Sequence, residues 1–389
     1  MTSSNALLCG KEMNTQADPP APESARTRAQ FGAARLILQN AIAARAFPGC
    51  AFGVLAGGEV VLEEAVGRFT YEEDAPVVTR ETVYDVASLT KVAATTAMAM
   101  LLHQRGQIDL EAPLGDLLPG FVAARQPGNQ ARRVTLRHLL AHNSGLPGYV
   151  EFFKTATTPD SLVRACLQLP LEAEPGTRAE YSDPGFILLG KALEVAAGES
   201  LGEWARREIF QRIGMAQTQF RPTGTTGSSL IPPTEEDTTF RHRRIQGEVQ
   251  DENAWVLGGV AGHAGIFSNV PDLLRLAQRV LKTQSVDDAS AAAATLFDRA
   301  TIELFATRQP PEGSSCALGW DTPSENSSSG KHFSRRSIGH LGFSGCSLWI
   351  DLEAEVAIVL LTNRTWPDRQ NQLIKTVRPA FHDAVREAL

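Results

Sequence analysis

The sequence has few of the features that mark several large classes of protein. Its 389 residues include five cysteines, an odd number, which are scattered and form no CxxC pair. A disulfide framework or a structural zinc site is therefore not expected, and a reducing compartment fits this usage better. No apolar run reaches the roughly 18 residues of a membrane-spanning helix, so no membrane span is predicted.

Long basic runs are also lacking. Lys and Arg number 37 against 44 Asp and Glu, a formal net charge of −7. The densest basic cluster, 241–244, is short and is interpreted as a solvated surface patch, so no nucleic-acid partner is predicted. Residues 1–28 are polar and rich in Pro, Ala and Ser, without the basic and apolar regions of a signal peptide. We interpret them as a disordered tail and expect a cytoplasmic protein.

Several catalytic signatures are missing as well. There is no H-E-x-x-H, and His242 and His263 stand alone, so neither is predicted to bind a metal. The glycine-rich stretch 258–265 lacks the Gly-Lys-Ser/Thr of a phosphate loop and is expected instead to approach an active site closely. Residues 342–346, Gly-Phe-Ser-Gly-Cys, lack the last glycine of G-x-S-x-G, which argues against an α/β-hydrolase.

What is present is a serine and a lysine three residues apart, Ser88 and Lys91, where a long apolar helical run begins. Positions i and i+3 share one face of a helix, so the hydroxyl and the amine can meet. A serine needs an adjacent base to act as a nucleophile, and a desolvated lysine can serve. A second S-x-x-K, Ser328 to Lys331, lies in a polar stretch predicted to be a loop.

Apolar patterns at both ends of the chain predict a single sheet. Two short runs around a Gly-Gly turn are typical of a β-hairpin, and two runs near the C-terminus are expected to be central antiparallel strands. The predicted strands are 50–55, 59–66, 346–352 and 355–362, and the predicted terminal helices are 29–45 and 370–389. We therefore expect an α/β fold with an antiparallel sheet built from both chain ends and flanked by helices.

Helical patterns separated by Pro/Gly-rich turns dominate the middle of the chain. The predicted helices there are 136–142, 161–167, 185–198 and 201–213, and a further one is expected at 272–283. This pattern predicts a disordered tail at 1–28, an α/β domain of 29–109 and 253–389, and an inserted, mostly helical domain of 110–252.

Three separated motifs resemble those of one superfamily. Ser88-Leu89-Thr90-Lys91, Tyr181-Ser182-Asp183 and His340-Leu341-Gly342 occur in the order S-x-x-K, Y-x-N and K-T-G or H-x-G of the serine β-lactamases and penicillin-binding proteins. The second motif has a tyrosine in place of the serine of S-D-N. In this respect it resembles the branch that holds class C β-lactamases, D-alanyl-D-alanine carboxypeptidases, D-aminopeptidases and β-lactamase-like carboxylesterases. Further segments share the resemblance, which spans about residues 30–385: 136–147, 181–190, 262–272 and 318–320. It implies a β-lactamase/transpeptidase-like fold.

The resemblance also implies roles for individual residues. Ser88 would be the nucleophile, acylated and then released by water. Lys91 and Tyr181 would share the general-base and general-acid work, with Lys91 either holding Tyr181 as a phenolate or taking the serine proton itself. The backbone N–H groups of Ser88 and Phe343, which follows Gly342, would form the oxyanion hole. His340 would line the wall facing the acyl end of the substrate, and neither a metal nor an organic cofactor is required.

Two departures from the family pattern bear on the substrate. Leu341 stands where relatives that bind β-lactams or D-alanyl peptides place a threonine hydroxyl, and Asp183 replaces the common asparagine. The resemblance implies that the Asp183 carboxylate points at Lys91. Both changes argue against a substrate carboxylate. We therefore predict a serine hydrolase acting on small carboxylic esters, or on a substrate with a free amine.

Other interpretations remain open at this stage. A D-aminopeptidase, a DD-peptidase or a weak β-lactamase of the same superfamily is an alternative substrate class, and a non-catalytic binding module is an alternative of another kind. Trp320 and Phe343 flank the third motif and are candidates for the substrate wall. Residues 248–253, His263 and the oligomeric state receive no assignment.

Overall fold

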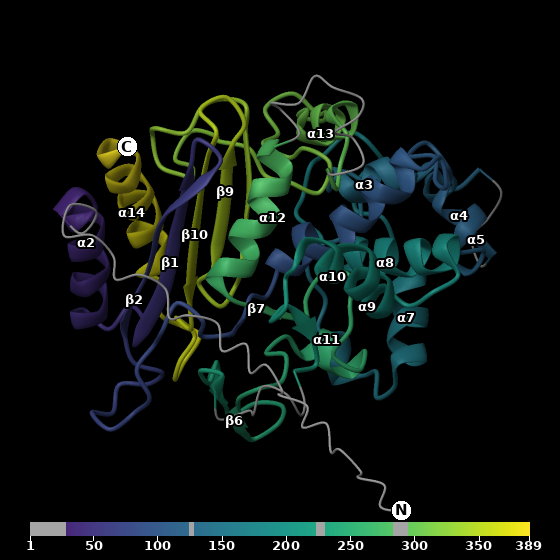
Figure 1. The fold of residues 1–389 in the computed structure, drawn as a ribbon. Coiled ribbons are helices and arrows are strands. Elements are labelled where there is room, and N and C mark those ends of the chain that lie inside the picture. Colours follow the sequence, from purple (N-terminus) through teal and green to yellow (C-terminus); the bar gives the residue numbers. More distant parts are fainter. Residues whose placement is uncertain (1–28, 124–127, 223–229, 283–294) are drawn as a thin grey trace, which may run out of the picture.

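The computed structural model describes residues 29–123, 128–222, 230–282 and 295–389, so the predicted tail lies outside the described part. The central feature is a five-stranded antiparallel sheet in the order β2-β1-β10-β9-β8 (Figure 1). Its strands are β1 (Gly49–Ala56), β2 (Glu59–Gly67), β8 (Ser337–Leu341), β9 (Ser347–Asp351) and β10 (Val356–Thr362). The prediction of an α/β fold with an antiparallel sheet from both chain ends is confirmed.

Helices cover both faces of this sheet. Helices α2 (Gly32–Ala43) and α14 (Ile374–Ala388) pack against each other on one face, and α12 (Val270–Lys282) lies on the other face, over β1 and β10 (Figure 1). Alternate side chains of β10 divide between the two sides: Ile358 and Leu360 join the core under α2 and α14, whereas Val359 and Leu361 join the larger core with α12. Burial on both faces explains the nearly continuous apolar run that predicted this strand.

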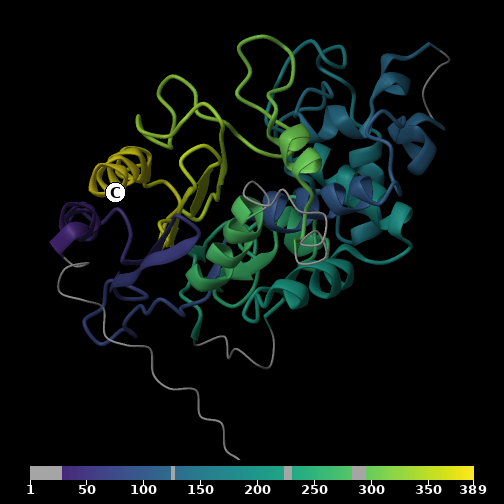
Figure 2. The ribbon, with the colours of Figure 1, turned by 45° about the horizontal axis from the view of Figure 1, so that its top comes forward.

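The remaining helices gather on the side of α12 away from α14 (Figures 1 and 2). They are α3 (Ala97–Gln104), α4 (Leu114–Leu117), α5 (Gly120–Ala123), α6 (Leu136–Leu140), α7 (Pro159–Leu167), α8 (Asp183–Ala197), α9 (Leu201–Ala205), α10 (Gln211–Ile213), α11 (Glu252–Val256) and α13 (Arg299–Ala306). The larger apolar core runs without interruption from the α12 face of the sheet into these helices. The division into two domains stays a prediction.

Short strands near the site were not anticipated from the sequence. A three-stranded sheet joins β3 (Tyr84–Asp85), β7 (Ile266–Ser268) and β4 (Gln219–Phe220), and a two-stranded ribbon pairs β5 (Glu235–Asp237) with β6 (Arg243–Ile245). The edge strand β8 was not predicted either, and it contains His340 and Leu341 of the third motif. Strands this short carry too little periodicity to be detected in a sequence.

Candidate active site

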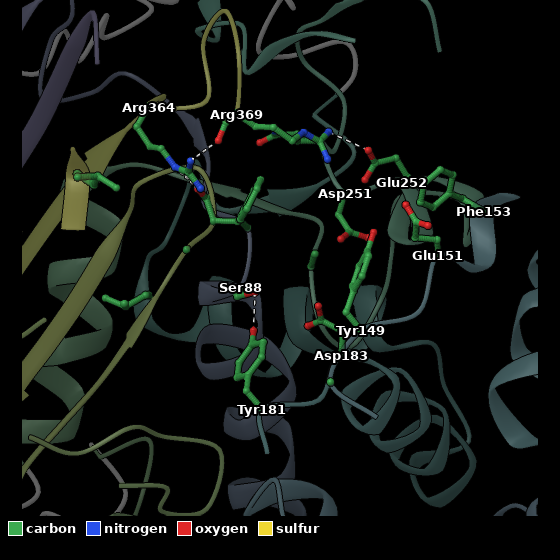
Figure 3. Close-up of a pocket in the computed structure, with 18 of the residues that line it drawn as sticks. Ser88, Tyr149, Glu151, Phe153, Tyr181, Asp183, Asp251, Glu252, Arg364 and Arg369 are labelled. Atoms are coloured by element: carbon green, nitrogen blue, oxygen red, sulfur yellow. Dashed lines mark hydrogen bonds and ion pairs between the residues drawn. The ribbon is translucent and has the colours of Figure 1, made fainter. Parts of the chain in front are cut away.

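A cavity of about 1050 Å³ opens at the end of β8 and contains Ser88. Tyr181 and Asp183 also line it (Figure 3). Leu341, Gly342 and Phe343 line it too, so the cavity brings together residues at all three motifs. No described helix is long and apolar enough to cross a membrane. Within the described ranges, no group of three or more His, Cys, Asp and Glu side chains is placed to hold a metal ion.

Ser88 lies in a tight turn between β3 and the following helix. The preceding Ala87 has a φ of 47°, an unfavourable conformation for a residue with a side chain, and Asp85 Oδ1 holds its N–H at 2.8 Å. The helix begins after Ser88 rather than at it, and its first part is a π-helix, Lys91–Thr96, that continues into α3. Such a strained turn at a candidate nucleophile is typical of functional sites.

The Lys91 side chain is fully buried and all of its hydrogen bonds converge on the site. Its Nζ donates to Ser88 Oγ at 3.1 Å, to Asp183 Oδ1 at 2.6 Å and to the carbonyl oxygen of His263 at 3.1 Å. Burial lowers the pKa of Lys91, while the charge of Asp183 acts in the opposite direction. The expected contact between Asp183 and Lys91 is therefore present.

Tyr181 completes the contacts of Ser88. Its hydroxyl donates to Ser88 Oγ at 2.8 Å (Figure 3). The next residue, Ser182, accepts the N–H of Gly185 and caps α8, which fixes the chain direction at this point. Desolvation in the cavity, with the charge of Asp183 adding to it, raises the pKa of Tyr181 well above its ordinary value. At neutral pH this environment favours the neutral phenol over the phenolate.

The turn after β8 packs directly on the turn that carries Ser88. Gly342 is required there, because a Cβ atom at this position would lie 2.4 Å from the carbonyl oxygen of Val86. Ser344 is fully buried, and its Oγ donates to the carbonyl of Asp85 at 2.8 Å. Among the described residues, no acceptor is bound by the N–H of Ser88 or of Phe343. Two free backbone donors therefore occur on adjacent segments of the cavity wall.

His340 and Trp320 do not line this cavity, contrary to expectation. His340 is buried behind Tyr181, with ring centroids 5.9 Å apart, and its Nδ1 lies 2.8 Å from the carbonyl oxygen of Leu341. Burial and the charge of Lys91 lower the pKa of His340 to about 3. Trp320 is only 3% exposed. Side chains alternate along a strand, so His340 and Leu341 face opposite ways, and only Leu341 reaches the cavity.

The segment 248–253, for which the sequence suggested no chemistry, contributes to the opposite wall. Gln250, Asp251 and Glu252 line the cavity. Asp251 Oδ1 lies 2.9 Å from Nε2 of His263, the residue whose carbonyl holds Lys91. Burial tends to raise the pKa of Asp251, but the charge and hydrogen bond of His263 lower it to about 2. His263 is itself buried, and its isolation in the sequence gave no sign of these contacts with Asp251 and Lys91.

Arginine and aromatic side chains close the rest of the cavity. Arg369 pairs with Glu252 at 2.8 Å (Figure 3). The guanidinium of Arg364 lies 4.4 Å from the centre of the Phe343 ring. Phe153 and Phe240, in edge contact, also line the cavity. Apart from Phe343, which follows the third motif, these residues belong to no short motif, and only the packing of distant parts of the chain places them at the cavity.

Known proteins share this fold and sequence pattern. A family model described as Beta-lactamase matches residues 34–378. The chain belongs to the beta-lactamase family. It is 30% identical over 376 residues to the N-acetylmuramyl-L-alanine amidase of Bacillus subtilis (strain 168), covering 86% of this chain and 82% of that protein. It is 28% identical over 361 residues to a putative D-alanyl-D-alanine carboxypeptidase of Salmonella typhi, covering 84% and 81%.

Solved structures of beta-lactamase-like proteins agree in fold. EstCE1, described as a hydrolase with promiscuous acyltransferase activity, superposes with a TM-score of 0.72 at 22% identity, covering 93% of this chain and all of that one. An octameric penicillin-binding protein homologue from Pyrococcus abyssi gives a TM-score of 0.67 at 22% identity, covering 85% and 73%. The family match and the two named relatives show that the chain is a beta-lactamase-like serine hydrolase.

Proposed function

We propose that this beta-lactamase-like hydrolase cleaves small carboxylic esters through an acyl-enzyme formed on Ser88. The observation that carries the proposal is the convergence of two donors on one hydroxyl, Lys91 Nζ at 3.1 Å and Tyr181 at 2.8 Å from Ser88 Oγ. Loss of a proton from the Lys91/Tyr181 pair leaves a base in contact with the serine, which activates the nucleophile.

In the acylation step, Ser88 Oγ forms a bond to the substrate carbonyl carbon while its proton passes to the Lys91/Tyr181 pair. The carbonyl oxygen becomes an oxyanion within reach of the free N–H groups of Ser88 and Phe343. Collapse of this intermediate breaks the bond to the leaving group, which takes a proton from the pair. Water then attacks the acyl-enzyme in the same way, releasing the acid and restoring Ser88.

The preference for an uncharged acyl donor rests on Leu341 and Asp183. Leu341 lines the cavity but offers no hydroxyl, and the Asp183 carboxylate beside Lys91 repels a second carboxylate. An amide is the second candidate, since the two relatives of 30% and 28% identity carry the names of an amidase and a carboxypeptidase. The cavity, at about 1050 Å³, also accommodates groups larger than a short ester.

A substrate panel tests the proposal. We expect p-nitrophenyl butyrate to exceed nitrocefin in kcat/KM by about tenfold or more, which requires only ~1.4 kcal/mol of differential transition-state binding. D-amino-acid amides in the same panel examine the second candidate. Equal turnover of nitrocefin and the ester would refute the preference, and absence of turnover together with absence of phosphonate labelling would refute the hydrolase.

A further inference from the structure

Two peptide groups carry the free N–H donors of the site, and the carbonyl of each accepts both a backbone N–H and a buried side-chain donor. The N–H of Phe343 shares its peptide group with the carbonyl of Gly342, which accepts from Arg378 Nη2 at 2.7 Å. The N–H of Ser88 shares its peptide group with the carbonyl of Ala87, which accepts from Thr90 Oγ1 at 2.7 Å. These two contacts come from unrelated parts of the chain, α14 and the helix after Ser88.

Arg378 is an unusual residue to find inside the protein. It is 6% exposed, and within the described residues it forms no ion pair with a carboxylate. Its donors are directed instead at three backbone carbonyls of the turn after β8, those of Gly342, Gly345 and Cys346. Burial lowers the pKa of Arg378 to about 10, so it stays charged at neutral pH. Burying a cation among neutral partners is costly.

Thr90 is equally enclosed. It is fully buried, and its Oγ1 both donates to Ala87 and accepts the N–H of Ile266 at 3.0 Å. Ile266 belongs to β7, which pairs with β3 directly ahead of Ser88. The threonine hydroxyl therefore ties the strained turn at Ala87 to the small sheet behind it.

We propose that Arg378 and Thr90 position the two oxyanion-hole donors by binding the opposite ends of their peptide groups. In a trans peptide, the carbonyl and the N–H point in opposite directions, so a donor that fixes the carbonyl also fixes the direction of the N–H. A hydrogen bond on the carbonyl also polarises the peptide group and strengthens its N–H as a donor. The inference rests on the proposed acyl transfer at Ser88. Although Arg378 also lines the cavity, its hydrogen bonds within the described residues all go to backbone carbonyls, so we assign it, like Thr90, to positioning.

Comparing an ester with its thionoester separates this role from general stability. The sulfur of a thionoester accepts hydrogen bonds weakly, so the ratio of kcat/KM for a neutral ester to that for its thionoester reports how well the oxyanion hole works. Deleting a whole donor costs about 10²–10³ in kcat. We therefore expect Arg378→Met and Thr90→Val each to lower kcat/KM for the ester by about tenfold or more and to lower the ratio by a similar factor.

Conservative and matched variants sharpen the result. Thr90→Ser keeps the hydroxyl and should restore the ratio, and Arg378→Lys keeps one charged donor and should restore it in part. Arg386→Met removes another arginine of α14, one that pairs with Asp351, and Thr234→Val removes a buried hydroxyl bound to the carbonyl of Ile245. Both controls should leave the ratio at its wild-type value.

Each outcome has a distinct meaning. Suppose that the ratio is unchanged in Thr90→Val and in Arg378→Met, while a phosphonate labels Ser88 of the wild type. That result would overturn the inference and leave the proposed function standing. Failure of the wild type to label would overturn the proposed function. A direct contact of Arg378 with a substrate anion would instead leave the neutral ester unaffected, which also contradicts positioning. If Arg378→Met does not fold, the Thr90→Val and Thr90→Ser pair decides.

Discussion

Asp183 Oδ1 lies 2.6 Å from Nζ of Lys91, so the buried lysine of the site is paired with a carboxylate in the place where an amide is common in the family. Burial lowers the pKa of Lys91 and the carboxylate opposes that shift. Desolvation is the main cause that raises the pKa of Tyr181, and the charge of the same carboxylate raises it further. A single side chain thus makes both groups harder to deprotonate than they would be beside an amide.

Asp183→Asn should therefore move the acidic limb of the kcat/KM profile to lower pH. Removing the negative charge lowers the pKa of both Lys91 and Tyr181, and activity is expected to rise as the pair loses a proton. The limb reports a macroscopic value of the coupled pair. The measurement is a pH–rate profile on one neutral ester.

Glu151→Gln is the matched control for that profile. Glu151 is another carboxylate of the cavity, but it pairs with Lys154 and makes no contact with Lys91. The acidic limb of the kcat/KM profile of Glu151→Gln should stay at its wild-type pH. A limb that shifts to higher pH in Asp183→Asn, or moves equally in both variants, would show that the pairing with Lys91 does not set the profile.

Ser88→Ala should abolish the single covalent adduct that intact mass detects after fluorophosphonate treatment. Ser344→Ala should still take one adduct, because Ser344 is buried and bound to the carbonyl of Asp85. Both serines lie near the same turn, so the pair controls for local disturbance. An adduct that persists in Ser88→Ala would show that another residue is the nucleophile.

Tyr181→Phe should discriminate between leaving groups. As a neutral phenol in contact with Ser88, Tyr181 can protonate a departing alkoxide or amine, and such a contribution is typically worth about 10²–10⁴ in rate. We expect a loss of that size in kcat for alkyl esters and amides, and a smaller loss for p-nitrophenyl esters, whose leaving group departs without a proton. The same loss for both substrate types would assign Tyr181 a positioning role only.

Asp251→Asn should destabilise the fold in a pH-dependent way. Although burial raises its pKa, the charge and hydrogen bond of His263 lower it to about 2, from 3.8. A depressed carboxyl pKa contributes stability that is present above about pH 4 and lost as pH falls toward 2, here on the order of 2 kcal/mol. Urea unfolding of the wild type and of Asp251→Asn, at pH 7 and near pH 3, measures this contribution. A difference in the free energy of unfolding that does not shrink on acidification would contradict the pairing of Asp251 with His263.

The sequence by itself determined four of the five strands of the main sheet, all but β8, and the contact of Ser88 with Lys91. A strand such as β10 is apolar throughout because both of its faces are covered. Ser88 and Lys91 are three residues apart at the start of a helix, so their side chains contact each other whatever the rest of the fold. Position in the known motif pattern also anticipated the meeting of Asp183 with Lys91. These features depend on local spacing or on a pattern of short motifs, and both can be read along a chain.

Only the tertiary structure decided which side chains reach the cavity and what holds them. It turned His340 and Trp320 away from the cavity and placed Asp251 beside His263. It also brought Arg378 to the carbonyl of Gly342, from 36 positions away in the chain. Such contacts leave no periodicity in the sequence, because they arise where separately folded elements pack, and the packing selects one partner among many residues of similar chemistry.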